Sequence, residues 1–328
     1  MADEIKIVSV LGAGTIGASW TALFLAAGLE VDIFDPSDNA EEYVKDYIQN
    51  AWTSLEELGL VKGGASQDKL RFFKTPEAAV KRAQFIQESV PEDLEMKHEL
   101  FQRIEPHLQE AAIVATSASG LLVREMQKGW KRPNRFILGH PFNPPHLIPL
   151  VELLANDKTE DGVLEEAEVF YASCGKVTIR VNKEVPAHVA NRLQAALWRE
   201  AIHLVNEGIA SVKDVDKAVW AGPGLRWSVM GPHMLFNLGS GGHGLEVFCE
   251  RYGSSFHRWW DDMGDPRLTN EIAKKLANGV RAEEAGRSFD ELSLERDAKI
   301  VAALKAMQEV SAAETQSPDK TVRKITAR

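Results

Sequence analysis

One glycine pattern near the start of the chain limits its possible folds more than any other sequence feature. Gly12, Gly14 and Gly17 follow a strand-like run at 5–11 and open a helical run. The next strand-like run, at 30–35, ends on Asp35, roughly 20 residues after the first glycine. A G-x-G-x-x-G turn between such a strand and helix is typical of the first βαβ unit of a doubly wound sheet.

This turn predicts a binding site for a dinucleotide. Its first glycine permits the sharp bend, its second lets the backbone approach a pyrophosphate, and its third allows close helix–strand packing. The phosphates would lie at the helix N-terminus, where free N–H groups and the helix dipole favour anions. Asp35 can accept hydrogen bonds from both ribose hydroxyls and would repel a 2′-phosphate, so the sequence favours NAD over NADP. The alternative is a glycine-rich turn that binds nothing. The predicted cofactor contacts of this segment are Gly12, Gly14, Thr15, Ile16, Gly17 and Asp35.

Two regions of different patterning divide the chain. Up to residue 182, short apolar runs alternate with amphipathic helical patterns, which is typical of a mostly parallel sheet covered on both faces. After about Pro186 the strand-like runs stop and helical patterns continue. We therefore expect an α/β fold, with a Rossmann-type NAD-binding domain over 1–184 and an all-helical substrate and dimerisation domain over 185–328. The expected strands lie at 5–11, 30–35, 84–89, 112–117, 135–140, 148–154 and 176–181.

The formal net charge of −10 over 328 residues restricts the possible partners. Nucleic acids and anionic membranes would be repelled unless a basic stripe compensated, and the sequence shows no such stripe. We expect small molecules or other copies of this chain as partners. The acidic N-terminus passes straight into a strand-like run with no targeting pattern, so a cytoplasmic location is the default expectation.

The stretch HPFNPPHLIPLVE at 140–152 has a histidine and a glutamate at its two ends. If it connects neighbouring strands, the Glu152 carboxylate can fix the tautomer of His140, whose other ring nitrogen then becomes a better proton acceptor. Oxidation of an alcohol by a nicotinamide needs such a base, because hydride leaves the carbon only as the hydroxyl proton is removed. A purely structural hydrogen bond is the alternative. A metal site of His140, His146 and Glu152 lacks a further ligand cluster, so no metal is expected.

Five motifs occur in order along the chain. They are LGAGTIG (11–17), IQESVPEDLEMKHELF (86–101), ATSASGLL (115–122), HPFNPPHLIPLVELL (140–154) and VPAHVANRLQAALWREAIHLV (185–205). Together they resemble the motifs of the L-3-hydroxyacyl-CoA dehydrogenase family. Within that family the chain is most similar to the group containing carnitine dehydrogenase and lambda-crystallin/L-gulonate 3-dehydrogenase. The resemblance reaches to about residue 310 and implies NAD-dependent oxidation of the 3-hydroxyl of an L-3-hydroxy acid.

The resemblance implies four catalytic residues and three further cofactor contacts. The catalytic residues are His140, Glu152, Ser119 and Asn191, and the cofactor contacts are Asn143, Glu92 and Lys97. Ser119 and Asn191 would donate hydrogen bonds to the substrate oxygen. Without the resemblance, Ser119 could equally cap a helix beginning near Leu121, and Asn191 could face water. Asn191 lies off an apolar helical stripe that we expect to face the core, formed by Val189, Leu193, Leu197, Ala201 and Leu204.

The segment 39–64 resembles a helical hairpin that helps hold CoA in the acyl-CoA members of the family. Only Lys45 and Lys62 are basic in it, against five acidic side chains, which makes it a poor cradle for a polyanion. A smaller free acid is therefore expected, and L-carnitine is the favoured substrate. L-gulonate, 3-hydroxybutyrate and a 3-hydroxyacyl-CoA are the competing substrates.

The helical half supplies candidates for binding carnitine. Aromatic faces recognise trimethylammonium groups, and an arginine can hold a carboxylate. The candidate substrate residues are Trp198, Arg226, Trp227 and Phe236. The alternative for the aromatic residues is a place in the helical core or at the interface of a homodimer, which we also expect. A function of another class is a crystallin-like structural protein that binds NAD without turnover.

Overall fold

The computed structural model describes the backbone of residues 5–316 and the side chains of residues 5–310. The chain divides into two compact units. The sheet unit contains the residues up to Val189 together with Asp297–Lys305, and the helical unit contains Ala190–Arg296 and the residues from Ala306. Residues 297–305, which the sequence assigned to the helical part, group with the sheet unit because Val301 is buried against Leu58 and Leu147.

The sheet unit is built on one eight-stranded sheet with the order β3-β2-β1-β4-β5-β6-β7-β8. All neighbouring strands run parallel except β6 and β7, which are antiparallel. The predicted mostly parallel sheet is therefore confirmed, and all seven expected strands are present. The strands are β1 (Ile7–Leu11), β2 (Glu30–Phe34), β3 (Leu70–Phe72), β4 (Phe85–Glu88), β5 (Ile113–Thr116), β6 (Phe136–Pro141), β7 (Leu150–Leu154) and β8 (Val177–Arg180).

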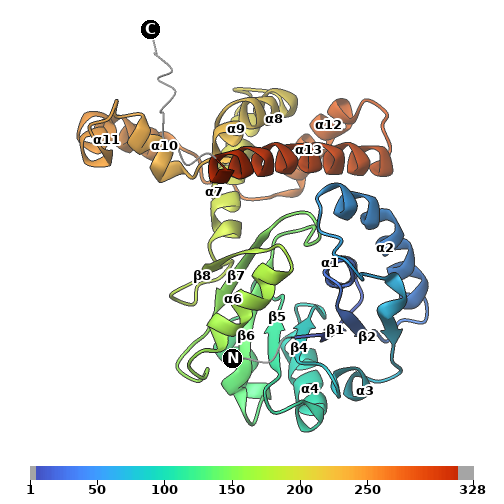
Figure 1. Cartoon of the computed structure of the whole chain (residues 1–328). Helices are drawn as coiled ribbons and strands as arrows, with labels where there is room; N and C mark the ends of the chain where they lie inside the picture. The colour runs from blue at the N-terminus through green and yellow to red at the C-terminus, as the bar shows by residue number, and fades with distance from the viewer. Residues whose placement is uncertain (1–4, 317–328) are drawn as a thin grey trace. The chain divides into compact units, whose positions relative to one another are not determined.

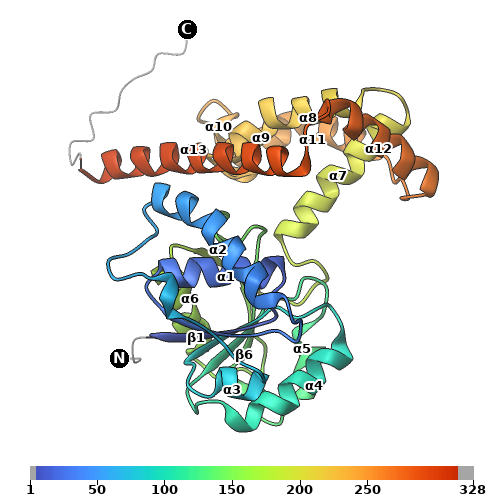
Figure 2. The same cartoon turned by 90° about the vertical axis from the view of Figure 1, so that its right-hand side faces the viewer.

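Helices cover both faces of this sheet, as Figures 1 and 2 show. On one face lie α1 (Thr15–Ala26), α2 (Ala40–Glu57) and α6 (Val163–Ser173), and on the other lie α3 (Pro76–Val80), α4 (Leu94–Ile104) and α5 (Val123–Met126). Each set forms its own hydrophobic cluster with the side chains of the strands beneath it. Because both faces are covered, β4 and β5 are buried along their whole length.

The expected helical hairpin at 39–64 is wrong. The segment contains one helix, α2, followed by turns. Beyond it come a short 3₁₀ helix at Gln67–Lys69 and the strand β3, which the sequence did not predict. Gly59 has a φ of +68° and ends α2: its N–H donates to the Glu56 carbonyl, and the Leu60 N–H donates to the Leu55 carbonyl. These two bonds form a Schellman motif, which terminates a helix at a left-handed glycine.

Among the residues that the structure describes, the helical unit has no strand, in agreement with the predicted all-helical domain. Its helices are α7 (Ala190–Asn206), α8 (Val212–Ala221), α9 (Pro223–Trp227), α10 (Pro232–Leu238), α11 (Leu245–Asp262), α12 (Asn270–Glu284) and the part of α13 (Phe289–Gln316) that lies outside 297–305. A small cluster of Val205, Val212 and Val215 joins α7 to α8.

The apolar stripe of α7 behaves differently along its length. Ala201 and Leu204 pack against the α7–α8 cluster, as expected of a core stripe. Leu193 and Leu197, nearer the start of the helix, are 62 % and 38 % exposed in the single chain. The expectation that the whole stripe faces the core is therefore wrong for its first half, because the described residues of the chain offer those side chains no covering layer.

Candidate active site

The glycine turn between β1 and α1 leaves room for a ligand beside the backbone. Gly12 has a φ of +91°, and a Cβ there would lie 2.7 Å from the Ser89 carbonyl oxygen. A Cβ on Gly17 would collide with the Gly12 carbonyl. Gly14 is different, because a Cβ on it would meet nothing within 4 Å. Close packing therefore requires the outer two glycines, while the space beside the middle one is open.

The N-terminus of α1 can accept an anion. Gly14 is the N-cap residue, no side chain caps the helix, and its first turn carries no acidic residue. The first N–H groups of α1 therefore have no side-chain acceptor, and the helix dipole favours a negative charge beside them. Thr15 is exposed at this end, where its hydroxyl lies 3.3 Å from the Tyr43 hydroxyl, and Ile16 is half-buried.

Asp35 lies one residue beyond the end of β2, beside the glycine turn. One of its carboxylate oxygens accepts the Ala13 N–H at 2.7 Å, and the other accepts the Ser37 N–H at 2.9 Å. A carboxylate tied to this turn is well placed for ribose hydroxyls. The open glycine backbone, the uncapped helix and the adjacent carboxylate together fit the pyrophosphate and ribose of NAD.

The expected base and its expected carboxylate partner are brought together by strand register. His140 on β6 and Glu152 on β7 are directly opposite each other in the antiparallel ladder. His140 Nδ1 lies 2.8 Å from Glu152 Oε2, and both side chains are buried. The other carboxylate oxygen, Oε1, accepts the Val189 N–H at 2.9 Å. Since a carboxylate accepts, Nδ1 carries the proton and Nε2 is left as the free base of the neutral ring.

Ser119 completes a hydrogen-bonded chain with this pair. It lies in the loop after β5, and its Oγ is 3.0 Å from His140 Nε2. Its alternative role as a helix cap is wrong, because α5 begins at Val123 with Leu122 as the N-cap residue and no side-chain cap. The structure thus brings three of the expected catalytic residues, Ser119, His140 and Glu152, into one hydrogen-bonded chain.

Glu92 and Lys97 lie on one segment but have different surroundings. Glu92 Oε1 accepts the N–H groups of both Ser119 and Gly120, next to the catalytic chain. Lys97 is buried, and its ammonium donates to Glu88 Oε1 at 2.6 Å and to the Val90 carbonyl at 3.2 Å. Lys97 therefore lies beneath the surface of the site, and its contact with the cofactor stays a prediction.

Glu88 is a residue of this site that the sequence reasoning missed. It ends β4, next to β1, where the strand order reverses. Besides Lys97, it accepts the Val90 N–H at 2.7 Å and the Thr116 hydroxyl at 2.6 Å. It therefore fixes the start of the β4–α4 loop, which carries Glu92. The available signal was a carboxylate at the end of a short strand that begins with two apolar residues.

The loop between β6 and β7 contains exposed Asn143, the expected cofactor contact. Lys176, just before β8, holds this loop, since its ammonium donates to the carbonyls of Pro145 and Ile148 at 2.6 and 2.5 Å. His146 Nδ1 lies 2.9 Å from Ser19 Oγ on α1. His146 thus anchors the loop to a helix. Within the described part of the chain, no group of three or more His, Cys, Asp or Glu side chains could hold a metal ion.

The remaining candidates belong to the helical unit. Asn191 is half-buried in the first turn of α7, two residues after Val189. Trp198, Arg226 and Trp227 are exposed on α7 and α9. Phe236 on α10 packs instead against Phe248 and Phe256, with ring centroids 5.0 and 5.5 Å apart. The roles of Asn191, Trp198, Arg226, Trp227 and Phe236 in binding a substrate stay predictions.

The sheet unit and its site define a class of protein. A doubly wound sheet, an open glycine turn and a carboxylate–histidine–serine chain are the parts of an NAD-dependent dehydrogenase that oxidises an alcohol. The glycine turn, Asp35, Ser119 and His140 lie at or just beyond the carboxyl ends of β1, β2, β5 and β6, the edge at which such folds bind ligands, and Glu152 lies opposite His140 on antiparallel β7.

Comparison with known proteins agrees with this class. The NAD binding domain of 3-hydroxyacyl-CoA dehydrogenase matches residues 7–185, and the C-terminal domain of the same family matches residues 188–283. This chain belongs to the 3-hydroxyacyl-CoA dehydrogenase family, and its cofactor is NAD. It is an enzyme of the class that acts on CH–OH groups.

Several relatives are similar over nearly the whole chain. An L-carnitine dehydrogenase of Nocardiopsis dassonvillei is 39% identical over 95% of this chain and 94% of its own length. One of Streptomyces coelicolor is 41% identical over 93% of this chain and 95% of its own. Among solved structures, the NAD⁺-dependent 5-formyl-3-hydroxy-2-methylpyridine 4-carboxylic acid 5-dehydrogenase is 28% identical, with a TM-score of 0.80 over 93% of this chain and 99% of its own.

Proposed function

We propose that this protein oxidises L-carnitine to 3-dehydrocarnitine with NAD. The choice of substrate rests on the similarity to L-carnitine dehydrogenases, which is about 40% identity over nearly the full length. The observation that carries the chemistry is the hydrogen-bonded chain of Ser119, His140 and Glu152.

The proton path follows from the tautomer of His140. Nε2 accepts the hydroxyl proton of the substrate as the carbon–oxygen bond becomes a carbonyl. NAD, which the glycine turn and Asp35 would hold, would supply the acceptor for the hydride that leaves the same carbon. The resulting imidazolium is stabilised by the Glu152 carboxylate 2.8 Å away. Ser119, and Asn191 as a predicted second donor, polarise the oxygen and stabilise the charge that develops on it.

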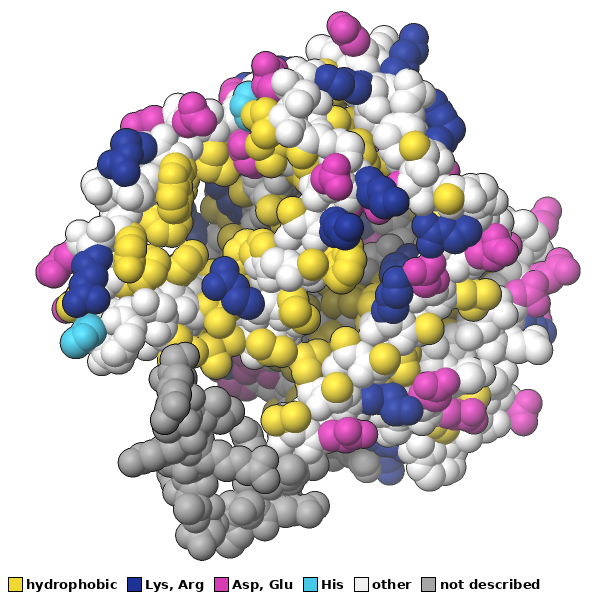
Figure 3. All heavy atoms as spheres, turned by 90° about the horizontal axis from the view of Figure 1, so that it is seen from above, with side chains coloured by type: hydrophobic (Ala, Val, Ile, Leu, Met, Phe, Trp, Pro, Cys, Tyr) yellow, Lys and Arg dark blue, Asp and Glu magenta, His cyan; other side chains and the backbone are white. Residues whose placement is uncertain are grey.

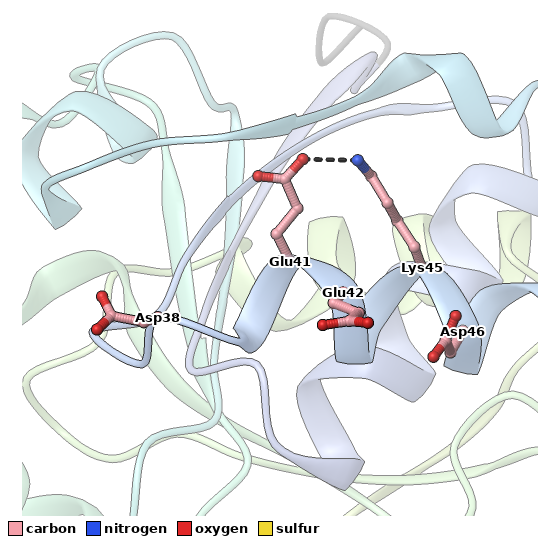
Figure 4. Close-up of a pocket in the computed structure, with 5 residues that line it drawn as sticks. All are labelled: Asp38, Glu41, Glu42, Lys45 and Asp46. Carbon is pink, nitrogen blue, oxygen red and sulfur yellow. Dashed lines mark hydrogen bonds and ion pairs between the residues drawn. The ribbon is translucent and has the colours of Figure 1, made fainter.

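The surface of α2 supports a small substrate over a CoA thioester. Figure 4 shows a pocket at the start of this helix lined by four carboxylates and one lysine. The lysine is Lys45, and its ammonium already pairs with Glu41 at 2.6 Å. The phosphates of CoA would be repelled from such a surface. The lining residues are Asp38, Glu41, Glu42, Lys45 and Asp46.

The helical unit offers groups that suit a trimethylammonium acid. Exposed Trp198 and Trp227 present aromatic faces for cation–π contact, and exposed Arg226 can pair with a carboxylate. Phe236 packs in an aromatic cluster but is only half-buried, so the exposed part of its side chain would contact the substrate. These residues are proposed because of their chemistry, and variants of each are the direct test.

A substrate panel followed by nicotinamide absorbance tests the proposal. The panel contains L-carnitine, D-carnitine, L-gulonate, L-3-hydroxybutyrate and its CoA thioester, with NAD in each case. We expect kcat/KM for L-carnitine to exceed the others. Preference for the thioester or for gulonate would refute the substrate, and no turnover of any compound would favour the crystallin-like alternative. His140→Ala is the control, because it should abolish turnover while leaving NAD binding nearly intact.

We also propose that the protein acts as a homodimer in the cytoplasm. Large apolar side chains are exposed on the single helical unit, among them Trp220 at 65 % and Trp260 at 61 %. Figure 3, which views the molecule from above, shows hydrophobic side chains gathered on the face turned toward the viewer. A second copy is the partner we infer for them. Light scattering should give twice the mass of one chain, and a monomer at micromolar concentration would refute the dimer. Within the described residues, no helix is long and apolar enough to span a bilayer.

A further inference from the structure

A second histidine lies beside the catalytic one. His188 is 3 % exposed, and the centroid of its ring is 5.1 Å from that of His140. Its Nε2 lies 3.2 Å from the Ala118 carbonyl oxygen. A carbonyl only accepts, so Nε2 carries the proton and the ring donates this bond. All three residues belong to the sheet unit.

The bonded carbonyl belongs to the peptide plane that precedes Ser119. The other end of that plane is the Ser119 N–H, which donates to Glu92 Oε1. Both polar ends of one peptide group are therefore held, by His188 on one side and by Glu92 on the other. Because this plane sets the direction of the Ser119 side chain, its orientation determines where Ser119 Oγ lies relative to His140.

The position of His188 is energetically unfavourable in two respects. Ala187 and His188 both have left-handed backbone conformations, with φ of +64° and +48°, which are unfavourable for residues other than glycine. Nδ1 of His188 is buried with no hydrogen-bond partner among the described residues. Strained backbone and unpaired buried polar atoms are found mainly at functional sites, where the surrounding structure holds them in place.

Charge explains why His188 must be neutral here. Burial lowers its pKa, and the neighbouring His140 acts in the same direction, while Ala118, Glu152 and Glu92 act in the opposite direction. A charged His188 would oppose the imidazolium that forms on His140 during turnover. A neutral ring with its proton on Nε2 keeps the bond to Ala118 without that repulsion.

We propose that His188 is a positioning residue, whose Nε2–H, together with Glu92, clamps the Ala118–Ser119 peptide and so places the Ser119 hydroxyl at His140. The inference rests on the proposed dehydrogenase function, since the clamped hydroxyl is the one that polarises the substrate oxygen. His188 touches neither substrate nor cofactor in this role and acts through Ser119.

A matched pair of variants tests the bond. The Gln side chain of His188→Gln can place an amide N–H where Nε2 lies, whereas His188→Met has a similar length and no donor. We expect H188M to lower kcat about tenfold or more, and H188Q to stay within about threefold of wild type. Both should keep the wild-type affinity for NAD, measured by fluorescence titration. Equal kcat in the two variants overturns the proposal.

A double-mutant cycle separates positioning through Ser119 from a general structural role. In a Ser119→Ala background the clamp has no hydroxyl left to place, so adding H188M should change kcat by less than about twofold. A further loss as large as in the wild-type background overturns the proposal. If H188M does not fold, the corresponding cycle with His188→Asn, read the same way, takes its place.

The tautomer provides a test that does not depend on any substrate. In ¹⁵N-histidine-labelled protein near pH 7, the resonances missing from the H188Q spectrum belong to His188. They should show a neutral ring protonated at Nε2. A charged ring, or a proton on Nδ1, overturns the inference, whereas silence on the substrate panel with the expected tautomer refutes only the proposed function.

Discussion

Replacing Glu152 with Gln isolates the negative charge beside His140, the proposed catalytic base. The carboxylate is fully buried and accepts hydrogen bonds from His140 Nδ1–H and from the Val189 N–H. A Gln side chain keeps the volume and one acceptor oxygen but turns an N–H toward one of these donors. The variant therefore removes a negative charge from beside the imidazolium and leaves one buried donor unpaired.

The size of the effect follows from the geometry. The charge of an imidazolium is spread over its ring, so the effective separation from the carboxylate is about 4 Å, which corresponds to about 4 kcal/mol at an effective dielectric constant of 20. Since each 1.36 kcal/mol is tenfold in rate, E152Q should lower kcat by about a thousandfold. The unpaired donor should lower the free energy of unfolding by about 1–3 kcal/mol.

The assay is steady-state NAD reduction, with NAD affinity and thermal unfolding measured on the same sample. Glu105→Gln is the matched control, because Glu105 is also buried and accepts the N–H groups of Lys131 and Arg132. It precedes β5, at the opposite edge of the sheet from the site. E105Q should lose similar stability and keep kcat. If E152Q retains more than about a tenth of wild-type kcat, the carboxylate does not act through charge.

Four variants test the cofactor site and the second histidine. Asp35→Ala should weaken NAD binding about 10- to 100-fold and improve the relative use of NADP, because it removes an acceptor for the ribose hydroxyls and a repulsion of the 2′-phosphate; unchanged cofactor preference would contradict this role. Gly14→Ala should weaken NAD binding while leaving the melting temperature within about 2 °C, whereas Gly17→Ala should lower both, since only the second methyl group meets backbone; equal melting temperatures would show that the contact at Gly17 relaxes. Burial lowers the pKa of His188 from its ordinary 6.5, so on acidification the unfolded chain binds this proton before the folded protein does. The wild type should therefore lose unfolding free energy relative to H188Q as the pH falls from about 6.5 to 5, and parallel curves would contradict the lowered pKa.

The sequence predicted those features that depend on local pattern. Seven strands were found because each is a short apolar run between turn residues. The partnership of His140 and Glu152 was predicted because one short connection joins their strands. The strand β3 was missed because its three residues, LRF, have no period long enough to detect. The end of α2 was missed because its helical pattern does not reveal that Gly59 adopts a left-handed conformation.

Features that depend on contacts between distant segments were not accessible from the sequence. The family resemblance implied that Lys97 contacts the cofactor. Its buried partner, Glu88, becomes evident only when α4 is folded against β4. The contact of His188 with Ala118 joins residues 70 positions apart. In the sequence, His188 is simply a residue that precedes the predicted helix, and no pattern marks it as part of a site. Its proposed role depends on His140, which is distant in the sequence and whose ring lies beside it in the folded sheet unit.

The antiparallel pairing of β6 with β7 has a consequence for how this family can change. The distance between base and carboxylate is set by backbone hydrogen bonds across the ladder, not by the length of the connection at 142–149. A slip of one residue would turn Glu152 to the opposite face of the sheet, so the pairing tolerates no gradual adjustment. Insertions within the connection leave the ladder unchanged. Loop redesign at 142–149 can therefore alter what approaches His140 while the base itself stays in place.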